Sequence, residues 1–235
     1  CRKETAEVLI TSPEVAMVSF TGSVAVGKLI HSKAGLKRVT LEMGSNSGNI
    51  VSQHADLERA ADSCVVGGYS YAGQVCISVQ RIYVQQSVMD AFLSLLLPRV
   101  NALKVGDPLD ESTDVGPLIS DEAATRVAAW LDEAKAGGAS VLAGGTINGS
   151  MMMPTVLSDV RREMKVVCEE VFAPLVSVMP YQRFEEAVAL VNDSRYGLNA
   201  GVFTQDLGEA FTAVNELEVG SVIINDSSAY RADHM

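Results

Sequence analysis

The sequence predicts an α/β protein with a largely parallel sheet and flanking helices. Two observations carry this prediction: helical patterns alternate with short β-branched runs along almost the whole chain, and turns containing glycine or proline separate them. The composition agrees, because 48% hydrophobic and 20% charged residues are ordinary values for a globular protein. A length of 235 residues suffices for one large domain or for parts of two.

The N-terminal segment predicts a helix, a strand and a second helix, over residues 5–10, 15–20 and 24–31. Ser23 is placed to cap the second helix, and Gly22 breaks the strand before it. Unpaired backbone N–H groups at a helix N-terminus attract anions, so this turn is a candidate anion site. An ordinary capped turn explains the same residues, and one glycine alone does not decide between the two interpretations.

A carboxylate, Glu42, follows the next predicted strand, which covers residues 38–41, and Gly44 comes shortly after it. A carboxylate at a strand end beside a glycine turn is a candidate general base. A solvated loop acid has the same local pattern, and solvated acids are the commoner case. A carboxylate abstracts protons well near neutral pH only when partial burial raises its pKa.

The candidate nucleophile Cys76 follows Gly73 and Gln74, between a predicted helix over residues 57–72 and a predicted strand that starts at Ile77. The glycine keeps side-chain bulk away from the thiol, which leaves a path for a substrate. Two interpretations are open for this stretch alone, because most cysteines outside disulfides are small buried hydrophobes. A Cys-His pair is not favoured, since none of the three histidines has a comparable glycine-flanked position at a strand end.

The rest of the chain continues the alternation. Further helices are expected at residues 88–103, 121–135, 184–192 and 207–217. Further strands are expected at residues 50–51, 141–142, 151–157, 175–179, 200–203 and 221–224. Pro98 should kink or divide the first of these helices, because proline lacks a backbone donor and clashes with the preceding turn.

Charge and cysteine usage exclude several classes of function. The net charge of −11 argues against nucleic acid and against anionic membrane surfaces as partners. No apolar run reaches the length of a membrane span, so we expect no membrane insertion. The four scattered cysteines and three histidines do not predict a metal site, and they suit a reducing compartment, so we expect a cytoplasmic protein. Because the chain starts at Cys1, inside a helical pattern, we expect a fragment of a longer protein.

Four motifs occur in a fixed order along the chain. They are Phe20-Thr21-Gly22-Ser23, Leu41-Glu42-Met43-Gly44, Gly73-Gln74-Val75-Cys76 and Glu170-Val171-Phe172-x-Pro174. Together with the spacing between Glu42 and Cys76, they closely resemble the aldehyde dehydrogenase superfamily. Residues 153–157, 196–204 and 220–225 look like further blocks of that family, so the resemblance covers essentially the whole chain. It favours the nucleophile interpretation of Cys76 over the buried one.

The resemblance implies the chemistry. Cys76 would attack the aldehyde carbon to give a thiohemiacetal, with its own backbone N–H as one oxyanion donor. Hydride transfer to NAD or NADP would leave a thioester, and Glu42 would activate the water that hydrolyses it. The substrate would be a small-molecule aldehyde and the product a carboxylic acid.

The resemblance also implies a cofactor site. Glu170 would hold the nicotinamide ribose and Phe172 would pack near the nicotinamide. Gly22 and Ser23 would lie beside the pyrophosphate, which agrees with the anion interpretation of their turn. Two departures from the family pattern bear on this site: Ser45 stands where a glycine is usual, and Ala173 replaces the glycine after the motif phenylalanine.

The implied domain organisation is partial. Residues 1–48 would be the C-terminal part of an NAD(P)-binding domain of Rossmann type, residues 49–224 the catalytic domain, and residues 225–235 a return segment toward the cofactor or oligomerisation region. The full-length protein would be a homodimer or homotetramer. Two alternatives remain for this chain: a cofactor-independent esterase or thioesterase, and a truncated, non-catalytic subunit.

Overall fold

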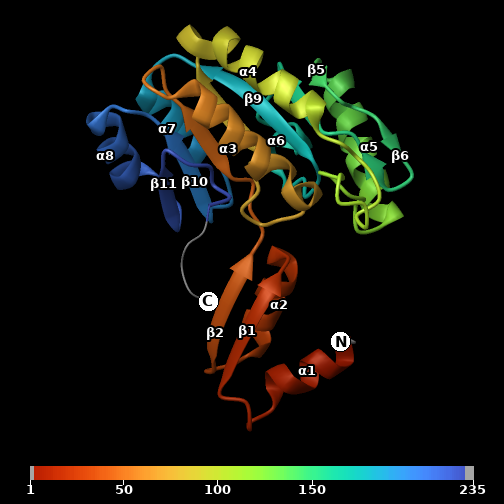
Figure 1. Cartoon of the computed structure of the whole chain (residues 1–235). Coiled ribbons are helices and arrows are strands. Elements are labelled where there is room, and N and C mark those ends of the chain that lie inside the picture. The colour runs from red at the N-terminus through yellow and green to blue at the C-terminus, as the bar shows by residue number, and fades with distance from the viewer. Residues whose placement is uncertain (1–2, 231–235) are drawn as a thin grey trace. The chain divides into compact units, whose positions relative to one another are not determined.

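The chain folds into two compact units. The computed structural model describes residues 3–230. One unit is Cys1–Gly44 and the other is Ser45–Met235, and we call them the N-terminal unit and the C-terminal unit. Figure 1 colours them along the chain, the N-terminal unit in red and orange.

The N-terminal unit is built on a strand–helix–strand motif. Its elements are α1 (Lys3–Thr11), β1 (Met17–Gly22), α2 (Val24–Lys33) and β2 (Arg38–Met43). The two strands pair in parallel, and α2 is the crossover between them. Ile10, Ile30 and Ala34 form its small buried core. These elements confirm the expected order of helix, strand, helix and strand.

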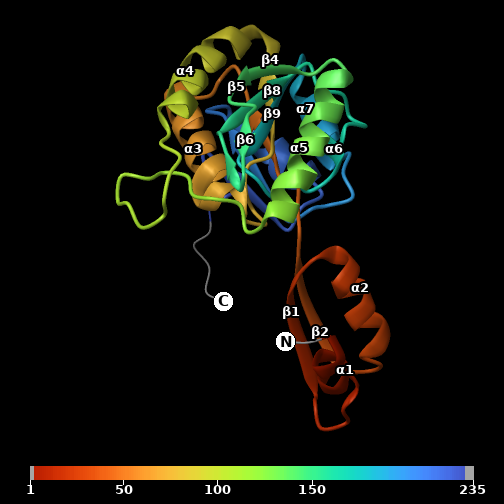
Figure 2. The ribbon, with the colours of Figure 1, turned by 90° about the vertical axis from the view of Figure 1, so that its right-hand side faces the viewer.

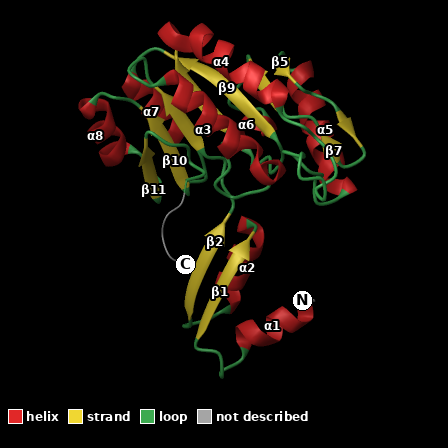
Figure 3. Ribbon diagram, in the orientation of Figure 1, coloured by secondary structure: helices red, strands yellow, loops and turns green. Residues whose placement is uncertain are grey.

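The C-terminal unit contains a seven-stranded sheet within the described residues. The sheet has the order β11-β10-β3-β4-β9-β8-β5, and only the edge pair β5–β8 is antiparallel. Its strands are β3 (Gly48–Val51), β4 (Arg81–Gln85), β5 (Ser140–Ala143), β8 (Thr155–Ser158), β9 (Leu175–Tyr181), β10 (Asn199–Phe203) and β11 (Ser221–Ile224). The largely parallel α/β sheet predicted from the sequence is therefore confirmed. Figure 3 shows its strands in yellow between the helices.

Helices cover both faces of this sheet. They are α3 (Leu57–Tyr69), α4 (Met89–Ala102), α5 (Asp121–Ala136), α6 (Lys165–Cys168), α7 (Phe184–Asn192) and α8 (Leu207–Glu216). In Figure 2, α3 and α4 lie on one side of the strands, and α5, α6 and α7 lie on the other. The alternation along β4 fits this arrangement, because Ile82 and Val84 join the core with α3 and α4 while Tyr83 joins the core with α7.

One prediction around Cys76 was wrong in its secondary structure. Instead of a strand from Ile77, the chain forms a 3-10 turn at Ser70–Gly73 and an irregular segment, and β4 begins only at Arg81. The segment is irregular because its backbone N–H groups bond outside the sheet: Val79 donates to the carbonyl of Gly67 in α3. Cys76 therefore lies in a turn and not at the edge of a strand.

Two proline positions also differ from expectation. The single strand expected over residues 151–157 is split into β7 (Met151–Met152) and β8, because Pro154 between them has no N–H for a ladder. β7 pairs instead with β6 (Ile147–Asn148). Pro98 does not divide its helix, and α4 continues through this residue. The proline removes one helical hydrogen bond, and the complete burial of its neighbours Leu96 and Val100 offsets that loss.

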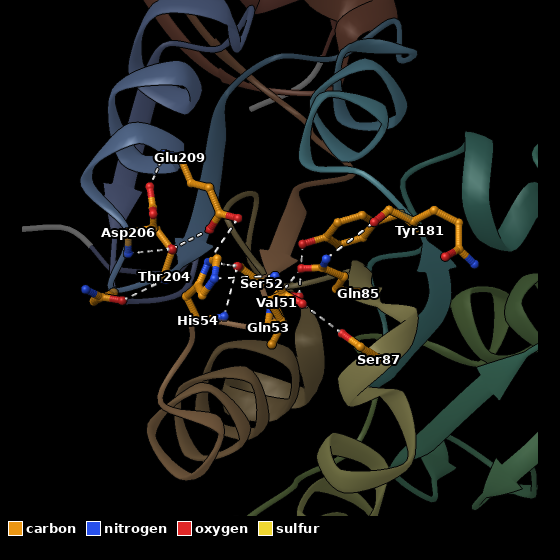
Figure 4. A network of polar contacts seen from close by, with 12 residues as sticks. Val51, Ser52, Gln53, His54, Gln85, Ser87, Tyr181, Thr204, Asp206 and Glu209 are labelled. Carbon is orange, nitrogen blue, oxygen red and sulfur yellow. Dashed lines mark hydrogen bonds and ion pairs between the residues drawn. The ribbon is translucent and has the colours of Figure 1, made fainter.

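The carboxyl ends of the central strands are tied together by polar side chains, as Figure 4 shows. The Tyr181 hydroxyl at the end of β9 donates to the carbonyl of Val51 at the end of β3, over 3.2 Å. Thr204, after β10, donates to Glu209, whose other oxygen lies 3.3 Å from His54. The Cys76 and Glu170 motifs, by contrast, precede β4 and β9, so they lie at the opposite, amino end of the sheet.

Candidate active site

Cys76 is partly exposed in a tight turn of the C-terminal unit. The N–H of Ser78 donates to the carbonyl of Val75 over 3.0 Å, which closes the turn around the cysteine. Two hydrogen bonds anchor the turn to other parts of the unit. The Ser78 hydroxyl donates to the carbonyl of Gly67 in α3, and the Ser228 hydroxyl donates to the carbonyl of Ile77. These bonds anchor the turn at Ile77 and Ser78, directly after the partly exposed Cys76.

The backbone just before the turn is strained. Tyr71, Ala72 and Gly73 all have left-handed φ angles, of 52°, 55° and 66°. Such angles cost energy for residues other than glycine and persist only where surrounding contacts impose them. At Gly73 the contact is direct, because a Cβ there would lie 2.2 Å from the carbonyl oxygen of Ala173. The glycine thus lets the Cys76 segment press against the backbone of the Phe172 segment.

Glu170 lies beside this contact and is half-buried. Its carboxylate accepts a 3.0 Å hydrogen bond from the backbone N–H of Ser45. Burial raises the pKa of Glu170, and the Ser45 bond and the nearby charge of Arg126 partly oppose the rise. Arg126 also donates to the carbonyl of Val171, which fixes the residue after the glutamate. Ser45, which stands where the family usually has glycine, makes this bond through its backbone, and its side-chain hydroxyl lies 3.1 Å from that of Ser47.

Phe172 presents an aromatic ring at the surface. It is 37% exposed, and its φ of 52° is left-handed, which is unusual for a bulky residue. Val171 and Ala173 on either side are 1% and 4% exposed, so the ring is displayed by a firmly anchored backbone. Phe172 and Glu170 line one small pocket, and Val75 and Ser78, on either side of Cys76, line it too. The structure thus brings the Cys76 and Glu170 motifs together.

The other described cysteines have different settings. Cys64 is fully buried in α3, and burial together with the charge of Asp226 raises the pKa of its thiol. Such a thiol is a poor nucleophile. Cys168 is partly buried at the end of α6, where its sulfur lies 3.6 Å from the carbonyl of Glu163. None of the described cysteines lines the pocket beside Glu170, and Cys76 adjoins it through its neighbour Val75.

A larger cavity of about 580 Å³ lies on another side of the C-terminal unit. Arg81 is its buried charge, only 3% exposed. The guanidinium donates to the carbonyls of Leu190 and Val191 in the last turn of α7, where the helix dipole favours a cation. Cys168 and Asn46 also line this cavity, whereas Cys76 and Glu170 do not.

The N-terminal unit brings the other two motifs together. In the pairing of β1 with β2, Thr21 stands opposite Glu42 and Gly22 stands opposite Met43. Ser23 caps α2 as expected, with its hydroxyl accepting from the N–H of Val26. The Glu42 strand end and the α2 N-terminus therefore share one edge of this unit. Glu42 itself is partly buried.

A close helix–strand contact holds this edge. A Cβ at Gly27 in α2 would lie 2.5 Å from the sulfur of Met43, so the helix lies close to β2 and a larger residue there would displace the Met43 side chain. The first turn of α2 has no acidic side chain. An anion approaching its free N–H groups would thus meet no like charge from that turn.

Comparison with known proteins assigns the chain to a protein family. The family model described as "Aldehyde dehydrogenase family" matches residues 2–235. The chain belongs to the aldehyde dehydrogenase family. The resemblance found in the four sequence motifs is therefore confirmed. No cluster of three or more His, Cys, Asp or Glu side chains suited to a metal ion occurs among the described residues, and no described helix is long and apolar enough to cross a membrane.

Curated members of the aldehyde dehydrogenase family match the chain closely. A 3-sulfolactaldehyde dehydrogenase of Priestia megaterium is 49% identical over 232 residues, which are 99% of this chain and 49% of that protein. A lactaldehyde dehydrogenase of Methanocaldococcus jannaschii is 41% identical over 227 residues, 97% of this chain and 49% of that protein. The chain thus spans about half the length of the curated relatives it matches.

Solved structures of the family share the fold. A glyceraldehyde-3-phosphate dehydrogenase of Methanocaldococcus jannaschii, complexed with NADP, is 40% identical with a TM-score of 0.94, over 98% of this chain and 50% of that one. Aldehyde dehydrogenase 21 of Physcomitrella patens, in complex with succinate, is 38% identical with a TM-score of 0.95, over 98% of this chain and 48% of that one. The aldehyde-dehydrogenase-like fold predicted from the sequence is confirmed.

Some residues of the site could not be singled out from the sequence. Gln80 and Arg126 both bond to the segment around Glu170, yet each stands in an ordinary amphipathic pattern. The signal for Gln80 is weak: it is a polar residue in a stretch that runs into a buried strand. Only the position of a segment some 90 residues later reveals its role, since Val171 and Gln80 are 91 positions apart.

Proposed function

We propose that the protein containing this chain oxidises an aldehyde to a carboxylic acid with NAD or NADP. The observation that carries the proposal is the packing of residues 73–78 against residues 170–173. The contact between them is the close approach of Gly73 to the carbonyl of Ala173. It supports a reaction in which a thiol and a bound cofactor meet at one place. Family membership and the NADP complex of a family structure agree with it.

The residues present fit a nicotinamide dinucleotide. Phe172 offers an exposed flat ring on a rigid backbone, which suits stacking against another ring. Glu170 offers acceptor oxygens in a half-buried position, which suits a ribose hydroxyl. Gly22 and Ser23, at the N-terminus of α2, suit a pyrophosphate. When bound, the nicotinamide supplies the hydride acceptor.

The covalent steps belong to Cys76 and Glu42. The Cys76 thiolate forms a bond to the aldehyde carbon while the carbonyl π electrons move to oxygen, and the Cys76 N–H stabilises that oxyanion. Departure of hydride from the same carbon leaves a thioester on the cysteine. Glu42 takes a proton from water, the oxygen attacks the thioester carbon, and the thiolate departs from the carboxylic acid. The place of Glu42 in the motif Leu41-Glu42-Met43-Gly44 supports the role of base.

We also propose the domain assignment of this chain, and the oligomeric state and cellular location of the whole protein. Residues 1–48 would belong to the cofactor domain, residues 49–224 to the catalytic domain and residues 225–235 to a return segment. Exposed apolar side chains on α8, at Leu207, Phe211 and Val214, support a homodimer or homotetramer. The small number of cysteines supports a cytoplasmic location.

The test compares matched cysteine variants. The chain alone, and the chain joined to the part of the Priestia megaterium relative that it does not cover, are incubated with small aldehydes and NAD or NADP. Reduced cofactor should form with the wild type and with Cys168→Ala, and not with Cys76→Ala. Ester hydrolysis without any need for a dinucleotide would favour the hydrolase alternative. A folded fusion that gives neither reaction would contradict the proposal.

A further inference from the structure

The side-chain amide of Gln80 connects the Cys76 segment to the Glu170 segment. Its nitrogen donates to the carbonyl of Glu169 over 2.6 Å and to that of Val166 over 3.4 Å. Its oxygen accepts from the N–H of Val171 over 3.0 Å. The bonds to residues 169 and 171 therefore hold Glu170 from both sides.

The orientation of this amide is fixed by its surroundings. Two carbonyl oxygens need a donor and one N–H needs an acceptor, so only one of the two flipped amide positions satisfies all three. Gln80 is only 5% exposed, so a lost bond would not be replaced freely by water. Its backbone is fixed as well, since the N–H donates to the carbonyl of Ser47 and the carbonyl accepts from Ser177.

We propose that Gln80 is a positioning residue that fixes Glu170 and Phe172 relative to the Cys76 turn. Gln80 acts through the backbone of residues 166–171, to which its side-chain amide is hydrogen-bonded. The meaning of this role for cofactor binding rests on the proposed function. Loss of the clamp loosens the ribose-binding glutamate and the ring beside it, while the turn around Cys76 keeps its own bonds to Gly67 and Ser228.

The sharpest variant is Gln80→Glu, which keeps the shape of the side chain. An ionised carboxylate can still accept from Val171 but faces the carbonyl of Glu169 without a proton to donate. It also adds negative charge beside Glu170 and Glu169, with Arg126 and Arg195 as the cations bonded to the same segment. A protonated carboxylic acid can donate again, so the defect should be reversed in acid. Gln80→Met has no polar atoms and should show the same loosening at every pH.

Gln85 provides a matched control at the other end of β4. Its amide also donates to a carbonyl, that of Gln182, and accepts from an N–H, that of Gln53. Figure 4 shows it in the network at the carboxyl end of the sheet, away from the Cys76 turn. Gln85→Glu makes the same chemical change at the last residue of the strand that follows Gln80, and its two bonds go to Gln182 and Gln53 instead of residues 166–171.

The first measurement is hydrogen exchange of the peptide covering residues 166–173, each variant compared with wild type at the same pH. At about pH 8, Gln80→Glu should exchange roughly tenfold faster, and at about pH 5 the difference should shrink. Gln85→Glu should match wild type in this peptide. Wild-type exchange in both Gln80 variants would overturn the proposal, and this result does not depend on whether the protein turns over.

The second measurement separates positioning from general destabilisation. In the fusion described above, Gln80→Glu should raise the KM for the dinucleotide by about tenfold, while Cys76 reacts with a thiol probe at a rate within about twofold of wild type. Faster exchange with an unchanged KM would show a merely structural clamp and overturn the proposal. A wild-type fusion without turnover contradicts the proposed function instead, and the exchange result then decides the role of Gln80 alone.

Discussion

The backbone N–H of Ser45 donates a 3.0 Å hydrogen bond to the carboxylate of Glu170, across 125 positions of sequence. Three segments that precede β3, β4 and β9 thus converge at the amino end of the sheet, and each carries a residue of the candidate site or its support. The bond also sets the electrostatics of Glu170, because it and Arg126 favour the charged form that burial disfavours.

Replacing Glu170 by glutamine should change how stability depends on pH. The pKa of Glu170 is raised above its ordinary value of 4.5, so the folded state binds the proton more tightly than the unfolded state. The wild type is therefore favoured below that ordinary value and loses stability as pH rises through the folded-state pKa. Glu170→Gln keeps an acceptor for Ser45 and cannot ionise. In urea titrations, the unfolding free energy of the variant should therefore rise relative to that of the wild type as pH increases over this range.

Glu163 is the control for that experiment. The pKa of Glu163 is lowered, mainly by its hydrogen bond with Arg161, so the sign is reversed. As pH rises through the acidic range, the unfolding free energy of Glu163→Gln should decrease relative to that of the wild type. The decrease should be small, because Glu163 is exposed. If the unfolding free energies of wild type and Glu170→Gln changed with pH in parallel, the carboxyl of Glu170 would not be held in a desolvated position.

Gly73→Ala tests the close contact between the Cys76 and Phe172 segments. The new Cβ would meet the carbonyl oxygen of Ala173 at 2.2 Å, and the left-handed φ of 66° adds strain. Gly149 has a similar φ of 58° but open space around a Cβ. Gly149→Ala should therefore cost about 1 kcal/mol in unfolding free energy and Gly73→Ala clearly more, by about 2 kcal/mol or above. Equal losses in denaturant titrations would mean that the segments do not touch there.

The sequence predicted the elements that local patterns determine. The cap at Ser23 follows from a side chain that bonds its own backbone within three residues. The parallel sheet follows from the regular alternation of helices and strands. The site motifs were found because each is a short run of contiguous residues, and the family could be recognised from their order.

The remaining features depend on distant partners. The strand expected to begin at Ile77 is displaced to Arg81, because the backbone before it bonds to α3 and to the loop ahead of β3. The clamp made by Gln80 requires the position of residues 166–171, and no local pattern encodes that pairing. Pro98 remains inside α4 because tertiary burial outweighs a local rule.

Arg81, another residue whose role depends on distant carbonyls, should not tolerate lysine. Its guanidinium bonds the carbonyls of Asn46, Leu190 and Val191 and the hydroxyl of Tyr83. A lysine ammonium keeps the charge but has three donors and no planar fork, so Arg81→Lys should cost about 2 kcal/mol of unfolding free energy. Arg99→Lys is the control, because Arg99 pairs with exposed acids on α3, and it should change stability little. Similar denaturation midpoints for both variants would contradict the buried role.

Native-state alkylation should rank the described cysteines by burial. Cys64 is fully buried and its thiol pKa is raised, so it should react with a small alkylating reagent only when the C-terminal unit unfolds. Cys76 and Cys168 are partly exposed and should react in the folded protein. Mass spectrometry of peptides after timed pulses at increasing urea would give the rate for each thiol, and the Cys64 rate should follow the global unfolding curve. Labelling of Cys64 as fast as Cys168 in the absence of urea would show that α3 opens locally. In that case the support that Gly67 gives to the Cys76 turn would be weaker than its hydrogen bonds indicate.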